Sequence, residues 1–306
     1  MPGFLSLGST IDFTSVGIPA LKKRSSASVK EQVREASEVS SDLPKVADLI
    51  AANERTIAAL RAHPLLRNTL DTDVHDDLFI LRYVLSSNGN VERAARAICG
   101  GIQWRATNSD LLSRVEDLQD EVRNTIATGM LPWSNSSGQP VQFTTPFGVP
   151  FERWGHKSDR WHFEAGISNR ETAFRTCDRL TRESGRLVKL VMIQDASGMS
   201  LSILARSRAL ANNQGKLSKL SEQLYPQLID TIVITRPPSF LGIIHSMAQA
   251  VMSERVMSKF KVARDVGSLS RMTSLAPEAI PRCLGGAREW DAAWVPIAPD
   301  GTLKPH

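Results

Sequence analysis

The sequence contains few cysteines and no long apolar run. Its three cysteines, Cys99, Cys177 and Cys283, lie far apart, and none belongs to a CxxC pair or a Cys/His cluster. Such cysteines predict neither a disulfide framework nor a zinc site, and they favour a reducing compartment. The uncharged run 237–253 approaches the ~20 residues of a membrane-spanning helix, but it begins with two prolines and contains several polar side chains. We therefore expect no membrane-spanning helix.

Sequence motifs of catalysis and phosphate binding are also missing. GMSLS at 198–202 lacks the last glycine of a nucleophile elbow, no G-x-G-x-x-G follows a predicted strand, and no Walker lysine is present. The spacing of His156, His162 and Glu164 matches no zinc site. Asp195 ends a predicted strand, where α/β enzymes often place a functional group, but without a neighbouring base or nucleophile a turn or capping role is favoured. We expect no enzyme, no cofactor and no metal.

The charge of the chain is weakly positive and unevenly distributed. There are 37 basic against 32 acidic residues, which gives a net charge of +5 and a slight attraction to anionic surfaces. No basic stripe interleaved with aromatics occurs, so nucleic acid is not an expected partner. Residues 1–30 contain only Asp12 against four basic side chains and are rich in serine. This composition is typical of an organellar transit peptide or of a disordered tail.

Periodicity divides the chain into a helical front and an alternating back. Helical spacing is seen at 43–62, 76–85, 91–102 after a capping Asn90, and 115–128, with no convincing strand. After a Pro/Ser/Gly-rich connection, strands alternate with helices predicted at 160–184, 201–224 and 239–257. We expect an α/β (α+β) fold with a mixed sheet. The expected parts are a tail at 1–42, a helical subdomain at 43–130, a second domain at 131–290 and a tail at 291–306.

The segment after the strand TIVIT is apolar on nearly every side. Ser239 can cap a helix in which Leu241, Ala248 and Met252 extend the apolar surface well beyond one face. The main stripe, at helical spacing, consists of Phe240, Ile243, Ile244, Met247 and Val251. Such a helix is either packed into a core on both sides or exposes one side to an apolar ligand or a bilayer.

Five blocks occur in the order and at the spacing of one known family. DDLFILRYVLSSNGNVERAARAICGGIQWR (76–105) is similar to a signature in which an LLRFL helix precedes DVxxA and WR. LVMIQDASGMSLS (190–202) is similar to a strand that ends in DxxG, and QLYPQLIDTIVITRPPSF (223–240) is similar to YPERxxxxxxxNxPxxF. VMSERVMSKF (251–260) and IPRCLGG (280–286) are similar to the blocks ending in SKI and LPxxxGG. From about residue 43 to 290, the chain resembles the Sec14-like, or CRAL-TRIO, lipid-binding and lipid-transfer family.

The resemblance implies a helical front subdomain joined to a domain whose mixed sheet forms the floor of a deep apolar pocket. The helix at Phe240–Val256 stands where that family has a mobile gate, which closes over one lipid and opens at a membrane. The implied activity is exchange of a phospholipid or other hydrophobic ligand between membranes, without covalent chemistry. We accordingly expect a monomer that is cytoplasmic and contacts membranes peripherally, or one directed to an organelle through residues 1–30. The alternative is a lipid-sensing regulatory or scaffold module that binds without exchange.

The resemblance also implies positions for the headgroup of the ligand. Phosphatidylinositol-binding members use a lysine to meet the phosphate, and Lys259 with Ser258 keeps that pair. Their glutamate after YP is Gln227, their threonine before the lysine is Val256, and their basic residue in the front signature is Ser87. The phosphate contact is thus retained, whereas its polar companions are replaced.

Phosphatidylcholine-binding members place hydroxyls before DxxG, where this sequence has Leu190 and Met192, and Gln142 replaces one of the tyrosines that cage choline. A buried polar group without partners costs about 1–3 kcal/mol. The resemblance therefore disfavours a choline headgroup. Phosphatidylinositol bound through Lys259, or a hydrophobic molecule with one small polar or anionic end, both stay open.

Overall fold

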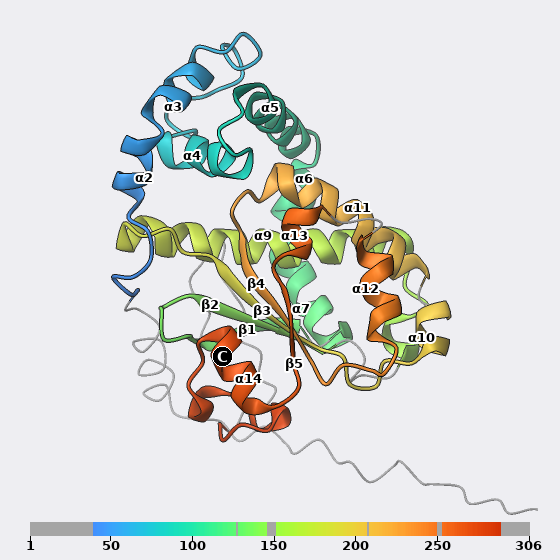
Figure 1. The fold of residues 1–306 in the computed structure, drawn as a ribbon. Helices are drawn as coiled ribbons and strands as arrows, with labels where there is room; N and C mark the ends of the chain where they lie inside the picture. The colour runs from blue at the N-terminus through green and yellow to red at the C-terminus, as the bar shows by residue number, and fades with distance from the viewer. Residues whose placement is uncertain (1–38, 127, 146–150, 207, 250–252, 289–306) are drawn as a thin grey trace, which may run out of the picture.

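The computed structural model describes residues 39–288 except 127, 146–150, 207 and 250–252. The described part of the chain starts with a front lobe of four helices, residues 46–107, which lies at one end of the molecule (Figure 1). The helices are α2 (Val46–Ala52), α3 (Glu54–Arg61), α4 (Asp77–Ser86) and α5 (Val91–Thr107), and α6 (Ser109–Ser113) and α7 (Val115–Ile126) follow them.

Capping side chains explain where the front helices begin. The Asp76 carboxylate accepts a hydrogen bond from the Phe79 amide at the start of α4, and the Asn90 side chain accepts one from the Arg93 amide at the start of α5. The predicted cap at Asn90 is confirmed. The predicted single helix over 43–62 is wrong, because α2 and α3 are separated at Asn53, whose amide side chain donates to the Leu49 carbonyl at 2.8 Å.

A five-stranded mixed sheet, in the order β1-β2-β3-β4-β5, forms the centre of the molecule. Strand β1 (Thr128–Ser134) is antiparallel to β2 (Pro140–Thr144), and β3 (Leu190–Asp195), β4 (Ile229–Thr235) and β5 (Phe260–Ala263) continue in parallel. Strand β1 replaces the first part of the connection predicted after residue 130. Proline is tolerated at Pro132 because β1 is an edge strand, where a missing N–H leaves no ladder bond broken.

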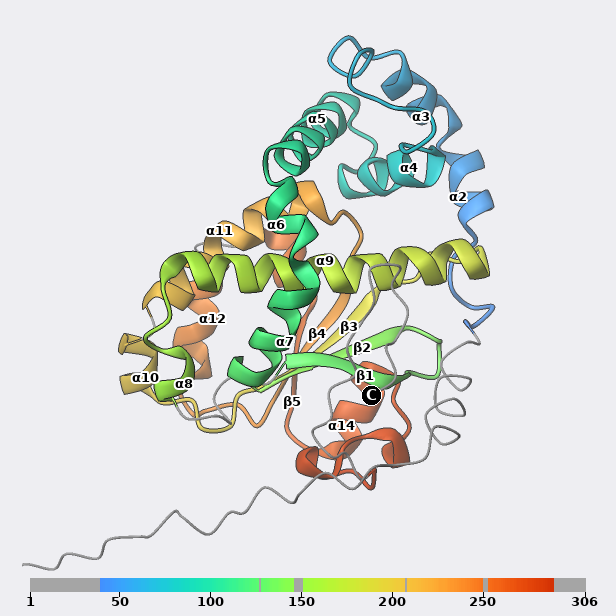
Figure 2. The same ribbon diagram turned by 180° about the vertical axis from the view of Figure 1, so that it is seen from behind.

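The two faces of the sheet are covered by different helices. Val191, Ile193, Val233 and Ala263 on one face pack against α14 (Val266–Thr273) and the 3₁₀ turns Pro277–Ala279 and Arg282–Leu284. The other face meets the long α9 (Asp159–Ser184), together with α7 and α11 (Arg208–Leu224) (Figure 2). Helix α9 starts at a capping Ser158 and ends at Gly185, whose φ of +65° suits glycine.

Residues of the front signature join the front lobe to the rest of the molecule. The buried Arg82 guanidinium donates to Asp178 at 3.1 Å and to Thr181 at 3.3 Å on α9. The Tyr83 hydroxyl donates to the Gln223 carbonyl of α11 at 2.6 Å. This part of the signature therefore has a docking role in the fold.

The region predicted as one gate helix is divided. Helix α12 (Leu241–Gln249) and helix α13 (Glu254–Met257) are separate, and Ser253 caps α13 by accepting a hydrogen bond from the Val256 amide. A continuous helix over 240–256 is thus wrong. Val251 and the side chains of Ile244 and Met247 lie outside the described residues. Within the described part, no helix is long and apolar enough to cross a membrane.

Candidate functional site

One face of the sheet is an apolar floor that the helices cover incompletely. Register places Gln142, Met192, Ile232 and Phe260 in one row across β2 to β5, so their side chains share a face. On the opposite face Val191, Ile193, Val233 and Ala263 are buried, whereas on this face Met192, Ile234, Val262 and Phe260 are only half-buried. Large apolar side chains left half-buried on one face of a sheet are suited to contact with an apolar ligand.

The strand residues predicted from the sequence, Gln142, Leu190 and Met192, differ in their burial and in their neighbours. The Gln142 side chain is buried between the row positions of Met130 and Met192. Leu190 is fully buried in the core formed with α9 and α11, away from the half-buried part. The row Met130–Gln142–Met192–Ile232–Phe260 contains no hydroxyl and no charge, which gives a choline headgroup no charged partner there.

Two apolar side chains are exposed on helices α10 and α12. Ile243 on α12 and Leu201 on α10 (Leu201–Arg206) are each 55% exposed. The two helices lie at the same side of the molecule in both views (Figures 1 and 2). Exposed apolar side chains grouped on neighbouring helices are typical of a surface that contacts another apolar phase.

The predicted phosphate contact lies at the start of β5, in a basic environment. The Lys259 ammonium donates to the Ile229 carbonyl. Burial, together with the positive charges of Arg255 and Lys189, lowers the pKa of Lys259 to about 8. No carboxylate of the described residues forms an ion pair with this ammonium. A partly buried cation without an ion pair is suited to an anionic ligand group.

Gln227 and Ser87 lie close to Arg255, at the edge of the front lobe. The Gln227 amide donates to the Ser86 hydroxyl at 3.2 Å, and Arg255 donates to the Ser86 carbonyl at 2.5 Å and to its hydroxyl at 3.2 Å. Ser87 is buried at the adjacent position. Val256 is half-buried on α13, and the exposed Ser258 donates to the Arg255 carbonyl at 2.9 Å. Arg255 therefore links the predicted headgroup positions to the front lobe.

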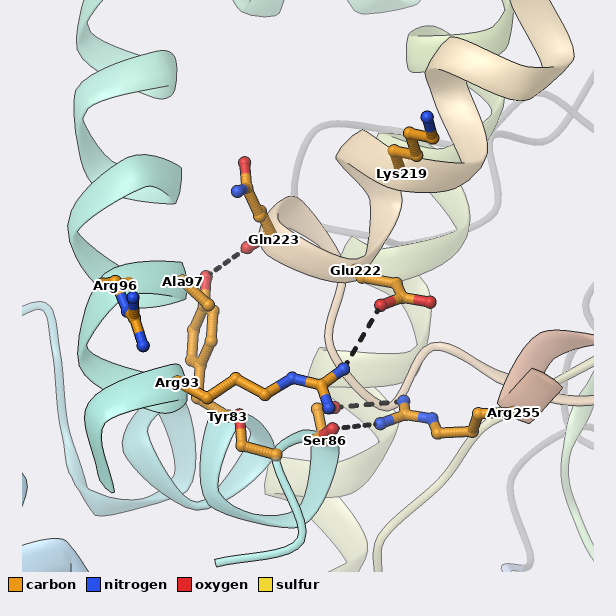
Figure 3. Close-up of a pocket in the computed structure, with 10 residues that line it drawn as sticks. Tyr83, Ser86, Arg93, Arg96, Ala97, Lys219, Glu222, Gln223 and Arg255 are labelled. Carbon is orange, nitrogen blue, oxygen red and sulfur yellow. Dashed lines mark hydrogen bonds and ion pairs between the residues drawn. The ribbon is translucent and has the colours of Figure 1, made fainter. Parts of the chain in front are cut away.

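A cleft opens beside these residues, between α5, α11 and α13 (Figure 3). Its volume is about 270 Å³, and its lining includes Ser87, Arg93, Arg96, Lys219, Glu222 and Arg255. Of these, only Ser87 was predicted from the sequence. The basic residues come from three separated parts of the chain, so no short sequence pattern predicts the cleft. Arg93 and Arg96 alone share an exposed helix face.

The turn that leads from β4 to α12 is fixed by a buried carboxylate. Asp195, 2% exposed, accepts hydrogen bonds from Arg236 at 2.9 and 2.5 Å and from the Ser197 hydroxyl at 2.7 Å. The Thr145 hydroxyl donates to it at 2.9 Å. Arg236 has a φ of +48° and directly precedes Pro237. Asp195 thus ties the ends of β2, β3 and β4 to the segment before α12.

Comparison with known proteins agrees with this architecture. Residues 161–286 match the family model described as the CRAL/TRIO domain. A solved structure titled "Crystal structure of Sfh5" has the same fold, with a TM-score of 0.58, 12% sequence identity and coverage of 72% of this chain and 83% of that one. Comparison with curated proteins gives no significant match. The domain match and the shared fold confirm the resemblance seen in the sequence blocks: residues 161–286 match the CRAL/TRIO domain, and the fold is Sec14-like.

Proposed function

We propose that this protein binds one lipid on the apolar floor and exchanges it between membranes, with α12 as the gate. The observation that carries the proposal is a set of half-buried apolar side chains on one face of the sheet, Met192, Ile234, Val262 and Phe260, whereas Val191, Ile193, Val233 and Ala263 on the opposite face are buried. Each methylene removed from water contributes about 0.8 kcal/mol. A floor of this kind stabilises acyl or other hydrocarbon chains without any catalytic group.

The composition of the site supports a ligand other than phosphatidylcholine. No side chain of the row is anionic and Phe260 is its single aromatic one, so the row offers a quaternary ammonium group no aromatic cage. Lys259, with its lowered pKa and without an ion pair among the described residues, can meet a phosphate or carboxylate. The ligand is accordingly a phosphatidylinositol-type lipid or a hydrophobic molecule with a small anionic end.

The exposed apolar side chains of α10 and α12 favour contact with a membrane during lipid exchange. Opening a gate over a lipid exposes apolar surface, and contact with a bilayer offsets this cost if the outer face of the gate is itself apolar. Ile243 and Leu201 present such a face. The protein would therefore act as a peripheral membrane protein during loading and release.

Identification of the lipid that co-purifies, followed by a vesicle-to-vesicle transfer assay, tests this function. Replacement of Ile243 by Asp places a charge where contact with the bilayer is proposed, at a cost of about 1–2 kcal/mol, so we expect roughly tenfold slower transfer. Leu65→Asp is the matched control, because Leu65 is also exposed (47%) but lies on the front lobe. It should leave transfer unchanged.

Three outcomes would contradict parts of the proposal. Phosphatidylcholine as the main co-purifying lipid would refute the headgroup assignment. Equal slowing by Ile243→Asp and Leu65→Asp would remove α12 from the membrane contact. Tight lipid binding without exchange would indicate a lipid-sensing module in place of a transfer protein.

The pKa of Lys259 makes ligand affinity depend on pH. Affinity for a phosphorylated lipid should fall as the pH rises through about 8, because the ammonium loses its proton there. Lys259→Arg keeps its charge and should show no such fall, whereas Lys259→Ala should bind the phosphorylated lipid weakly at every pH. Fluorescent-lipid titrations of the three proteins provide the measurement.

The same shift affects stability with the opposite sign. Since the folded pKa lies below the ordinary lysine value of 10.5, the buried charge lowers the free energy of unfolding below a pH of about 8. This penalty disappears as the pH rises toward 10.5.

An uncharged hydrophobic ligand serves as the control for the Lys259→Ala variant and should keep its affinity. An equal loss of affinity for charged and uncharged ligands would point to a disturbed fold.

A further inference from the structure

We propose that the ligand of this protein carries an uncharged hydroxyl or carbonyl group within its hydrocarbon part, and that Gln142 and Gln194 recognise that group. The inference rests on the proposed function, because it concerns a ligand bound on the apolar floor. It adds the chemical class of that ligand and two residues that determine specificity. These residues lie on β2 and β3, whereas Lys259 directly precedes β5.

Two amide side chains interrupt the floor on neighbouring strands. Strand register pairs Gln142 of β2 with Met192 of β3, and Gln194 lies two residues after Met192, so both glutamines share the floor face. Their Cα atoms are one strand spacing apart across the sheet and two residues apart along it, which gives a separation of about 8 Å. A glutamine side chain is long enough that one ligand oxygen between the two strands can meet both amides.

Neither amide has a hydrogen-bond partner within the described part of the chain. Gln142 is only 5% exposed, Gln194 is half-buried, and no hydrogen bond joins either side chain to another described residue. The nearest hydroxyls are already satisfied, since Thr144 beside Gln194 shares a hydrogen bond with Thr128 at 2.7 Å. A buried amide left without a partner is destabilising, so these two groups are suited to a ligand that supplies one.

The neighbours of the two amides on the sheet determine which oxygen fits. The two rows of side chains that contain the amides are Met130–Gln142–Met192–Ile232–Phe260 and Thr128–Thr144–Gln194–Ile234–Val262. Apart from the threonine pair, the other members are apolar, and neither row contains a charged side chain. A carboxylate or phosphate would find no cation in these rows, whereas a hydroxyl or carbonyl needs only the amides.

The same arrangement discriminates against a plain hydrocarbon chain. A chain lying over the amides displaces water from them without replacing its hydrogen bonds, which lowers affinity. A site built to hydrogen-bond an oxygen of its ligand rejects the analogue that lacks it. The two glutamines therefore select an oxygenated lipid over an otherwise identical saturated one.

The position of the oxygen along the ligand follows from the sheet. Gln142 and Phe260 share a row across three strand spacings, about 14 Å, and Lys259 directly precedes Phe260. If the anionic end of the ligand meets Lys259, the oxygen recognised by the glutamines belongs near the middle of a long acyl chain. An oxygen close to the anionic end would lie on the wrong side of the floor.

Displacement of a fluorescent fatty acid from the delipidated full chain measures this preference. The competitors are stearate, 12-hydroxystearate and 3-hydroxystearate, which share one carboxylate, so that any contact with Lys259 cancels in the comparison. We expect 12-hydroxystearate to bind about tenfold more tightly than stearate, and 3-hydroxystearate to bind like stearate.

The test variant is Gln142→Leu/Gln194→Leu, which keeps side chains of similar size without the amides. It should bind 12-hydroxystearate and stearate alike, through weaker binding of the hydroxylated acid and unchanged binding of stearate. Gln103→Leu is the matched control, because Gln103 is exposed on α5 in the front lobe. It should keep the tenfold preference.

The possible results separate this inference from the proposed function. Tight but equal binding of all three acids by the wild type would overturn the inference and leave the lipid site intact. An unchanged preference in the double variant, or a preference for 3-hydroxystearate, would place the contact elsewhere. Weaker binding of stearate by the double variant would assign the amides a structural role. Absence of binding by all three acids would contradict the lipid site itself, and the inference with it.

Discussion

Replacement of Asp195 by Ala should lower the free energy of unfolding by about 3 kcal/mol, among the largest effects of any single substitution in this chain. The carboxylate is almost fully buried and accepts hydrogen bonds from Arg236, Ser197 and Thr145. Alanine removes all of these acceptors at once. Because Arg236 itself is half exposed and can return to water, the cost should stay below that of a fully buried pair.

The loss of stability in Asp195→Ala should depend on pH, and the substitution should also affect the proposed gate helix α12. Burial alone would raise the pKa of Asp195, but the hydrogen bonds from Arg236, Ser197 and Thr145 outweigh it and lower the pKa. The stabilisation is therefore complete above the ordinary aspartate pKa of 3.8 and is lost as the pH falls through the lower folded value. Since Arg236 precedes α12, the variant should also change the rate of lipid exchange.

Urea unfolding at neutral and acidic pH measures the prediction. The difference between wild type and Asp195→Ala should shrink in acid, where the native carboxylate becomes protonated. Asp42→Ala, at an exposed aspartate, should change stability by less than about 0.5 kcal/mol. A similar small value for both variants would show that the ion pair with Arg236 contributes little.

Replacement of Glu171 by Ala should cost about 3–4 kcal/mol and weaken the attachment of the front lobe. The buried Glu171 carboxylate accepts hydrogen bonds from Arg105 of the front lobe at 2.9 and 3.2 Å and from Arg175 of α9 at 2.9 Å. The Arg105 guanidinium also lies 5.5 Å from the centre of the Tyr225 ring. Without the carboxylate, two largely buried guanidinium groups face each other with no anion between them.

A matched control is available on the same helix. Glu183 accepts a hydrogen bond from Arg179 four residues earlier, at 2.7 Å, but it is more than half exposed. An exposed pair of this kind contributes only about 0.3–0.5 kcal/mol, so Glu183→Ala should be nearly neutral. Denaturation curves of both variants, and of Arg105→Ala alone and combined with Glu171→Ala, would give the coupling energy. Additive effects in this cycle would contradict a direct role in lobe attachment.

Local signals in the sequence account for most of the elements. The cap at Asn90, the long helix at 160–184 and the strand at TIVIT all depend on residues close together in the chain, and the structure has them. Strand β1 was missed because Pro132 and the following serines resemble a connection. The predicted gate helix ran through Ser253 because its apolar spacing continues there, whereas Ser253 followed by Glu254 is a helix-start signal that was overlooked.

The candidate site was less accessible to sequence reasoning. Lys259, Gln227 and Ser87 were predicted as headgroup positions from their places in the motifs, and the structure places each of them near Arg255 or its partner Ser86. Arg255 itself was missed, as were the cations of α5 and α11, because tertiary packing alone brings these segments together. Arg236 was missed for the same reason: its partner Asp195 lies 41 positions away.

The order of the strands determines where this protein can be divided. The matched CRAL/TRIO region starts inside α9, after β1 and β2, yet β2 pairs with β3 along the sheet. A fragment confined to residues 161–286 would keep the pairing of β3 with β4 but leave the backbone groups of β3 that face β2 unpaired, along an apolar strand. Such an edge is a template for pairing between molecules and hence for aggregation. The unit that remains soluble on its own must therefore include the hairpin of β1 and β2 in addition to the matched region.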